Sequence, residues 1–156
     1  MLSNSCVEKP TTMTAIENNG LAGVADLVGQ EIVFPLGLLG FPDCRRFSLS
    51  RLEVGGDSDS PFFVLNSLDQ ELSFLVIHPD LVTAEYTVPS SPEMLGQLDA
   101  KSASELVALL IVTARDRIEE ITVNLQGPLL ISALSHRAMQ LVLEDYPLRQ
   151  PLVVAR

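Results

Sequence analysis

Apolar and polar residues alternate along much of the chain with the two-residue period of β-strands. Phe47 and Leu49 alternate with serines, and residues 82–88 and 121–125 repeat the pattern. Such alternation predicts strands that bury one face and expose the other. Turn-forming residues separate these runs, and helical periodicity is scarce. The pattern therefore predicts an all-β domain.

Three further runs are apolar on both faces, at residues 62–65, 72–77 and 106–112. Such runs are typical of central strands that are covered on both sides. By periodicity alone the third run could also be a buried helix, but its valines and isoleucine favour a strand.

The sequence predicts one short α-helix, between the second and the third of these apolar runs. Ser91 is placed as the N-cap, Pro92 as the first helical residue, and Glu93 near the positive end of the helix dipole. We expect this helix to end near Leu98. Residues 55–60 are polar and glycine-rich, which predicts a hairpin loop.

The predicted strands need a closed arrangement to bury both kinds of face. Closing about seven or eight of them into a small antiparallel β-barrel-like domain would leave few exposed edges. A two-sheet sandwich is the rival arrangement. Residues 1–19 mix Ser, Thr, Asn and Pro, and we expect a mobile leader there, followed by a single domain over residues 20–156.

The charge balance narrows the possible partners. The chain has 20 acidic and 10 basic residues and a net charge of -10, which argues against direct nucleic-acid binding because phosphate contacts need clustered lysines and arginines. The longest apolar stretch is far shorter than the ~20 residues of a membrane helix, so we expect no membrane association. No secretory signal is visible, so we expect a cytoplasmic protein.

Candidate catalytic and metal-binding residues are few. His78 and His136 are the only histidines, and Cys6 and Cys44 the only cysteines, so neither a multi-histidine metal site nor a disulfide framework is expected. No nucleophile elbow occurs. We therefore expect no catalytic residue, no metal and no cofactor. A small hydrolase or isomerase that uses His78 with a nearby acid remains an alternative.

Two peptide segments break apolar runs with bend-forming residues. The early signature is defined as residues 34–43, where Gly37 and Gly40 permit positive φ or a close backbone approach, and Phe41 is expected to anchor the turn in the core. We interpret this segment as a structural turn first and a contact surface second.

The late signature is defined as residues 121–129. Asn124 is polar among apolar neighbours, and we expect its amide to cap nearby backbone groups, next to the apolar Leu125 and the bend at Pro128. A role in binding is the less favoured interpretation of Asn124.

Taken in order, the two signatures and the apolar segments 61–68 and 72–79 between them resemble the FliW family of flagellar assembly factors. The early signature resembles the family pattern Phe-Pro-x-Gly-Ile-Pro-Gly-Phe-Glu, and it departs in having Leu39 where the family often has Pro and Pro42-Asp43 where an acidic residue often follows Phe directly. The pattern Thr-Ala-Asn-Leu-x-Ala-Pro matches the late signature except at Val123 and Gly127. The resemblance covers residues 31–154.

This resemblance implies a compact, mostly antiparallel barrel-like fold and a non-enzymatic regulator with two partners. The partners implied are flagellin, bound through its C-terminal region, and the translational repressor CsrA, which the regulator removes from flagellin mRNA. Because CsrA must be basic to hold RNA, acidic clusters are the candidate contacts: Glu119, Glu120, Glu144 and Asp145. A flagellin-specific secretion chaperone that does not bind CsrA is the alternative.

Overall fold

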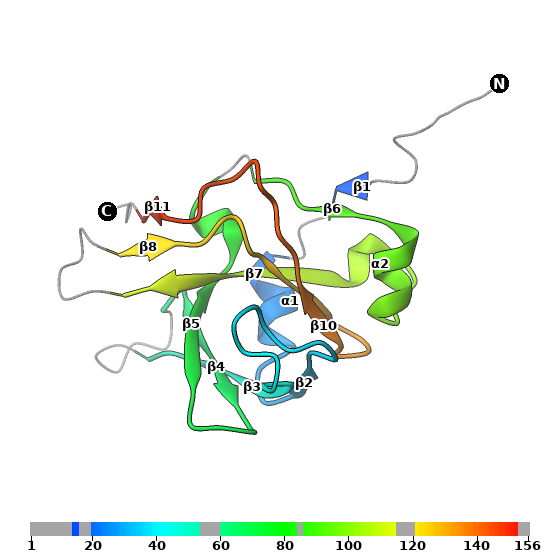
Figure 1. Cartoon of the computed structure of the whole chain (residues 1–156), viewed down its shortest axis with the longest axis horizontal. Coiled ribbons are helices and arrows are strands. Elements are labelled where there is room, and N and C mark those ends of the chain that lie inside the picture. Colours follow the sequence, from blue (N-terminus) through cyan, green and yellow to red (C-terminus); the bar gives the residue numbers. More distant parts are fainter. Residues whose placement is uncertain (1–13, 16–19, 54–59, 84–85, 115–120, 153–156) are drawn as a thin grey trace.

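The computed structural model describes residues 14–15, 20–53, 60–83, 86–114 and 121–152 (Figure 1). Short strands dominate these residues, with two short α-helices and two 3-10 turns. The elements in chain order are β1 (Thr14–Ala15), α1 (Gly20–Ala25), β2 (Glu31–Val33), β3 (Arg46–Arg51), β4 (Phe62–Ser67), β5 (Ser73–Ile77), η2 (Pro79–Leu81), β6 (Pro89–Ser90), α2 (Pro92–Gln97), η3 (Ala103–Glu105), β7 (Leu106–Thr113), β8 (Thr122–Val123), β9 (Leu129–Ser132), β10 (Ala138–Gln140) and β11 (Gln150–Pro151).

Nine of the described strands form one antiparallel sheet. Its main path runs β10-β9-β7-β5-β4-β3-β2, and β8 and β11 extend it beside β7. The first half of β7 pairs with β9 and its second half with β5, so β7 runs through the middle of the molecule (Figure 1). Strands β1 and β6 form a separate two-stranded sheet.

The sheet curls until its two end strands meet, but it does not close into a barrel. The only ladder contact between the ends in the described residues is a parallel bridge between Val33 and Arg137. There the Val33 backbone N–H donates to the His136 carbonyl at 3.0 Å. We call this contact the seam. The prediction of an all-β, antiparallel, barrel-like domain is confirmed, and the sheet differs from a fully closed barrel because only this one bridge joins its end strands in the described residues.

The main hydrophobic core is formed by the strand faces that the sequence predicts to be buried. Phe47 and Leu49 on β3 are buried, whereas the alternating Ser48 and Ser50 are more exposed. Leu49 pairs with Leu65 of β4. Phe34 packs edge-on against Phe47, with ring centroids 5.3 Å apart. Each fully buried side chain of this size stabilises the fold by about 1.5–3 kcal/mol. The run at residues 106–112 is confirmed as a strand, β7, and it is almost wholly buried.

Helix α2 forms where the sequence predicts it. The Ser91 side-chain oxygen accepts a hydrogen bond from the Met94 backbone N–H at 3.3 Å, and Pro92 occupies the first turn. Leu98 is the C-cap, and its side chain is buried in a core cluster with Leu106 and Leu130.

Two local predictions were wrong. Of residues 82–88, those that the structure describes form no strand: they follow the 3-10 turn η2, whose C-cap is Val82, and ladder pairing resumes only at β6. The apolar side chains of this segment pack into the core without forming a strand. Val82 and Tyr86 lie against one core cluster, and Val88 is buried in another. Helix α1 was not predicted, so the described chain has two α-helices rather than one.

Two predicted segments lie mainly outside the described residues. Of the predicted leader, the structure describes only Thr14–Ala15, which pairs with β6. Most of the predicted hairpin loop at residues 55–60 also lies outside, although β3 and β4 on either side of it are paired as an antiparallel hairpin requires. No helix among the described residues is long and apolar enough to span a bilayer.

Candidate functional site

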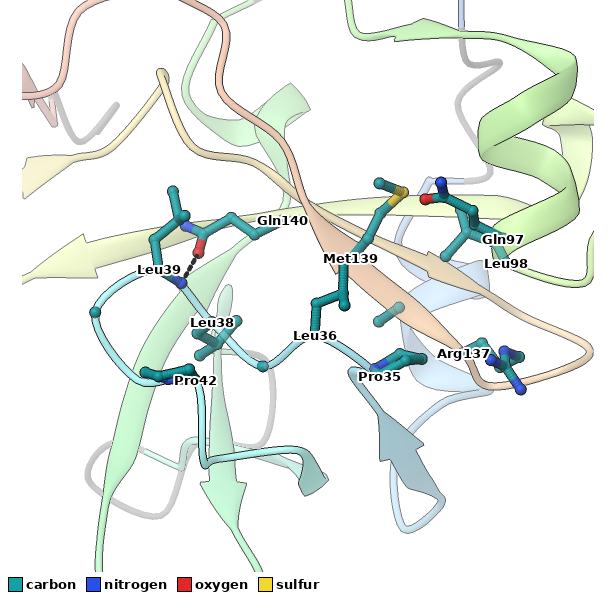
Figure 2. A pocket seen from close by; sticks show the side chains of 13 residues that line it. Pro35, Leu36, Leu38, Leu39, Pro42, Gln97, Leu98, Arg137, Met139 and Gln140 are labelled. Atoms are coloured by element: carbon teal, nitrogen blue, oxygen red, sulfur yellow. Dashed lines mark hydrogen bonds between the residues drawn. The ribbon is translucent and has the colours of Figure 1, made fainter.

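A largely apolar groove of about 600 Å³ lies between the early signature, β10 and the end of α2 (Figure 2). Its volume falls within the ~300–1,000 Å³ of typical ligand pockets. In Figure 2, Leu36 and Met139 lie at its centre, Leu39 and Gln140 at one end, and Pro35 and Arg137 at the other. The remaining lining residues are Gly37, Leu38, Gly40, Pro42, Gln97, Leu98 and Ala138.

The wall of the groove formed by the early signature is a tight turn. Gly37 and Gly40 have φ of +72° and +85°, so the prediction of positive φ is confirmed at both. A Cβ atom at Gly37 would lie only 2.5 Å from the Pro42 carbonyl oxygen, whereas Gly40 has open space. Leu38 and Phe41 exchange backbone hydrogen bonds of 3.2 and 2.8 Å across the turn. The backbone of this wall is therefore well fixed.

The turn directs its apolar side chains in different directions. Leu38 is buried, whereas Leu36 and Leu39 are 79% and 59% exposed. The expectation that Phe41 anchors the turn in the core was wrong. Phe41 is 40% exposed and packs edge-on against Phe74, with ring centroids 5.5 Å apart. Leu38 is the anchor, because the positive φ of Gly37 and Gly40 turns this leucine inward.

The late signature is held by Asn124, as expected. Its side-chain oxygen accepts hydrogen bonds from the backbone N–H groups of Gln126 and Gly127, both at 2.9 Å. Leu125 and Pro128 beside it are buried. Asn124 thus caps the turn that leads into β9.

Gln140 joins the two signatures. Its side-chain oxygen accepts a hydrogen bond from the Leu39 backbone N–H at 2.9 Å (Figure 2). Its side-chain nitrogen donates to the Gly127 carbonyl at 3.0 Å. Sequence reasoning missed this residue, and the one available signal was an amide side chain within the mixed run around β10. The structure therefore brings the two signatures together through a residue that belongs to neither.

The acidic candidates lie away from the groove or outside the described residues. Glu144 and Asp145 are exposed, and with Thr87 and Tyr146 they line a separate, more polar depression. Glu119 and Glu120 lie outside the residues that the structure describes. Neither Glu144 nor Asp145 lines the groove.

Two tyrosines, whose rings pack at a tilt of 55°, support the surface that carries Glu144 and Asp145. The rings of Tyr86 and Tyr146 lie 4.6 Å apart between centroids. The Tyr86 hydroxyl donates to the Leu125 carbonyl at 2.5 Å, and the Tyr146 hydroxyl accepts from the Thr87 backbone N–H at 3.0 Å. Burial, and secondarily the neighbouring Tyr146, raises the pKa of Tyr86, so this hydroxyl stays a donor. These contacts hold in place the segment that carries Glu144 and Asp145.

His78 has a structural partner rather than a place in the groove. It is 4% exposed, and its Nδ1 accepts the Asp80 backbone N–H at 3.2 Å as the N-cap of η2. Burial lowers the pKa of His78 despite the opposing charge of Asp80. His136 sits in the turn before β10 with φ of 63°. In the described part of the chain, no three His, Cys, Asp or Glu side chains gather as a metal site.

Three comparisons with known proteins agree. Residues 18–152 match the family model "FliW protein". The chain is 37% identical to "Flagellar assembly factor FliW" of Natranaerobius thermophilus, covering 78% of this chain and 80% of that one. It is 34% identical to the protein of the same name from Treponema denticola, covering 79% and 82%. The fold matches a crystal structure of the flagellar assembly factor FliW with a TM-score of 0.68, at 23% identity and covering 81% and 86%.

Proposed function

This chain belongs to the FliW family of flagellar assembly factors, and we propose that it serves flagellar assembly by binding flagellin and the translational repressor CsrA in turn. Flagellin that accumulates inside the cell occupies the protein. Once flagellin is secreted, the freed protein binds CsrA away from its RNA site and weakens its hold on flagellin mRNA. The protein acts in the cytoplasm by binding alone, without a catalytic step, a cofactor or direct contact with nucleic acid.

The groove is the observation that carries this proposal. Its lining is mostly apolar, it presents the exposed side chains of Leu36 and Leu39, and the early signature forms one of its walls. Concentrated exposed apolar surface on a soluble domain is typical of a protein-binding site. The groove contains no acid or histidine that could serve as a general base. These features favour a binding protein over the hydrolase alternative.

The charge distribution supports CsrA as the second partner. The net charge of -10 attracts a basic protein, and an acidic domain docked beside an RNA-binding protein also repels phosphate. Glu144 and Asp145 are exposed on an ordered surface away from the groove. Glu119 and Glu120 remain candidates from the sequence.

The first experiment is a titration of the purified protein with CsrA of the same organism, followed by addition of its flagellin. We expect a complex with CsrA that dissociates when flagellin is added. Binding to flagellin alone, at every salt concentration, would identify the protein as a secretion chaperone. Binding to neither partner would contradict the proposal and return attention to the hydrolase alternative.

Charge reversal tests which acidic surface acts on CsrA. We expect the double variant Glu144→Lys with Asp145→Lys, or Glu119→Lys with Glu120→Lys, to restore CsrA binding to flagellin mRNA in the presence of the protein. Asp26→Lys with Glu31→Lys, two exposed acids near β2, is the matched control. Unchanged antagonism in both test variants would remove the electrostatic part of the proposal.

A further inference from the structure

The groove presents its apolar side chains on a wall that is already ordered. Leu36 and Leu39 are strongly exposed, yet the backbone between them is held by the turn at Gly37 and by the hydrogen bond from Leu39 to Gln140. A surface that is fixed before binding loses little conformational entropy when a partner docks. The groove is thus suited to receive apolar side chains from another protein.

Arg137 gives the groove a charge opposite to that of the whole protein. It is the only charged residue in the groove lining, in a chain with a net charge of -10. Its backbone is fixed at the seam, where its carbonyl accepts the Ser132 N–H at 2.9 Å and its N–H donates to the Ser135 hydroxyl at 3.2 Å. The residue is exposed, so its backbone is positioned while its guanidinium stays accessible.

The other arginines of the sheet differ from Arg137 in having internal partners. Arg46 pairs with Asp69 at 3.1 Å, and Arg51 donates to the Ser60 carbonyl at 3.3 Å and lies over the ring of Phe63. Within the residues that the structure describes, the Arg137 guanidinium has no such hydrogen bond or ion pair. A guanidinium beside an apolar surface is well suited to a carboxylate from outside.

The geometry sets the spacing that a bound segment must have. Arg137 and Gln140 stand at opposite ends of the groove, with Leu36 and Met139 between them (Figure 2). Three residues of strand span roughly 10 Å. A matching segment therefore presents apolar side chains over about two helical turns, or about three extended residues, and then an acidic side chain.

We propose that the groove binds an apolar segment of flagellin whose acidic side chain pairs with Arg137. This inference rests on the proposed function and adds to it the assignment of one partner to one surface. Charge complementarity decides the assignment, because a CsrA surface rich in cations would be repelled by Arg137 and attracted to Glu144 and Asp145. The two partners then contact different surfaces of one 156-residue chain, so displacement of CsrA by flagellin requires that the two bound proteins overlap in space.

The test measures binding of the full chain to flagellin and to CsrA separately, for the wild type and four variants. Arg137→Glu should weaken flagellin binding by about tenfold or more, and Leu36→Asp should do the same by placing a charge against an apolar segment. Arg137→Lys should retain most of the affinity. Arg149→Glu is the matched control, an exposed arginine outside the groove. CsrA affinity should change less than about threefold in the groove variants.

Folding is controlled in the same experiment, because Leu36 and Arg137 are exposed and their variants should melt as the wild type does. A lysine in flagellin in place of the paired acid should restore binding to the Arg137→Glu variant. Wild-type flagellin affinity in both Arg137→Glu and Leu36→Asp would overturn this inference while leaving the proposed function intact. An equal loss of affinity for flagellin and for CsrA in the groove variants would overturn the assignment of flagellin to the groove. A wild-type protein that binds no flagellin would instead refute the proposed function.

Discussion

The side-chain oxygen of Gln140 accepts a hydrogen bond from the backbone N–H of Leu39 at 2.9 Å, across 101 positions of the chain. The other end of the same amide donates to the Gly127 carbonyl at 3.0 Å. One side chain therefore fixes the wall of the groove to the turn that Asn124 caps. The two signatures form a single structural unit around it.

Gln140→Leu should destabilise the protein by about 1–2 kcal/mol, because it keeps a similar volume but leaves the Leu39 N–H and the Gly127 carbonyl without this partner. Urea unfolding measures the change. Gln97→Leu is the control, since Gln97 also lines the groove but makes no side-chain hydrogen bond within the described residues. Equal stability of the two variants would show that the Gln140 bridge contributes nothing.

Gly37→Ala should cost far more stability than Gly40→Ala, although both glycines have positive φ. At Gly40 only the left-handed backbone is penalised, by about 1–2 kcal/mol. At Gly37 the new methyl group would also overlap the Pro42 backbone, which adds roughly 1–3 kcal/mol. Thermal unfolding of the two variants side by side decides the order, and equal losses would contradict the close approach at Gly37.

Asn124→Ala should destabilise the protein by about 1–2 kcal/mol, because two backbone N–H groups lose their acceptor. Asn124→Asp keeps an oxygen at the same position and should remain close to the wild type at neutral pH. Chemical denaturation of both variants checks the pair. If Asn124→Ala were as stable as the wild type, the prediction would be wrong, because water would then replace the Asn124 cap without loss of free energy.

Acidification should destabilise the protein through His78 from about pH 6.5 downward. Because burial lowers the pKa of His78 below its ordinary value of 6.5, the unfolded chain binds a proton that the folded chain does not. Stability is therefore unaffected by His78 above this pH, and it falls below it until the lower folded-state pKa is reached. The measurement is the free energy of unfolding as a function of pH.

His78→Asn should remove this part of the pH dependence, because asparagine can still accept the Asp80 N–H at the start of η2. His136→Asn controls for the loss of a histidine, since asparagine tolerates the positive φ at that position. Parallel curves for the wild type and His78→Asn below pH 6.5 would contradict the prediction.

Local chemistry accounts for what the sequence predicts well. Helix α2 needs only Ser91 to accept the Met94 N–H and Pro92 to begin the first turn, so its start can be read from adjacent residues. The faces of β3 follow from alternation within six residues.

Long-range packing accounts for what the sequence does not predict. Residues 82–88 alternate like a strand, but the available neighbours for Val82 and Tyr86 are core clusters rather than a strand edge. Phe41 is displaced from the core because Leu38 occupies the inward position of the turn. The role of Gln140 depends on residues distant in the chain, and its one local signal is an amide side chain within the mixed run around β10.

The seam between Val33 and Arg137 also has a consequence during protein synthesis. The groove needs the early signature and β10 together, so a ribosome that has made only the first wall must add about a hundred residues before the second exists. At ordinary elongation rates this takes roughly 5–20 s. Partners that need the groove therefore bind only chains in which β10 has been made and folded, and a chain that stalls or is truncated before β10 offers them no complete binding surface.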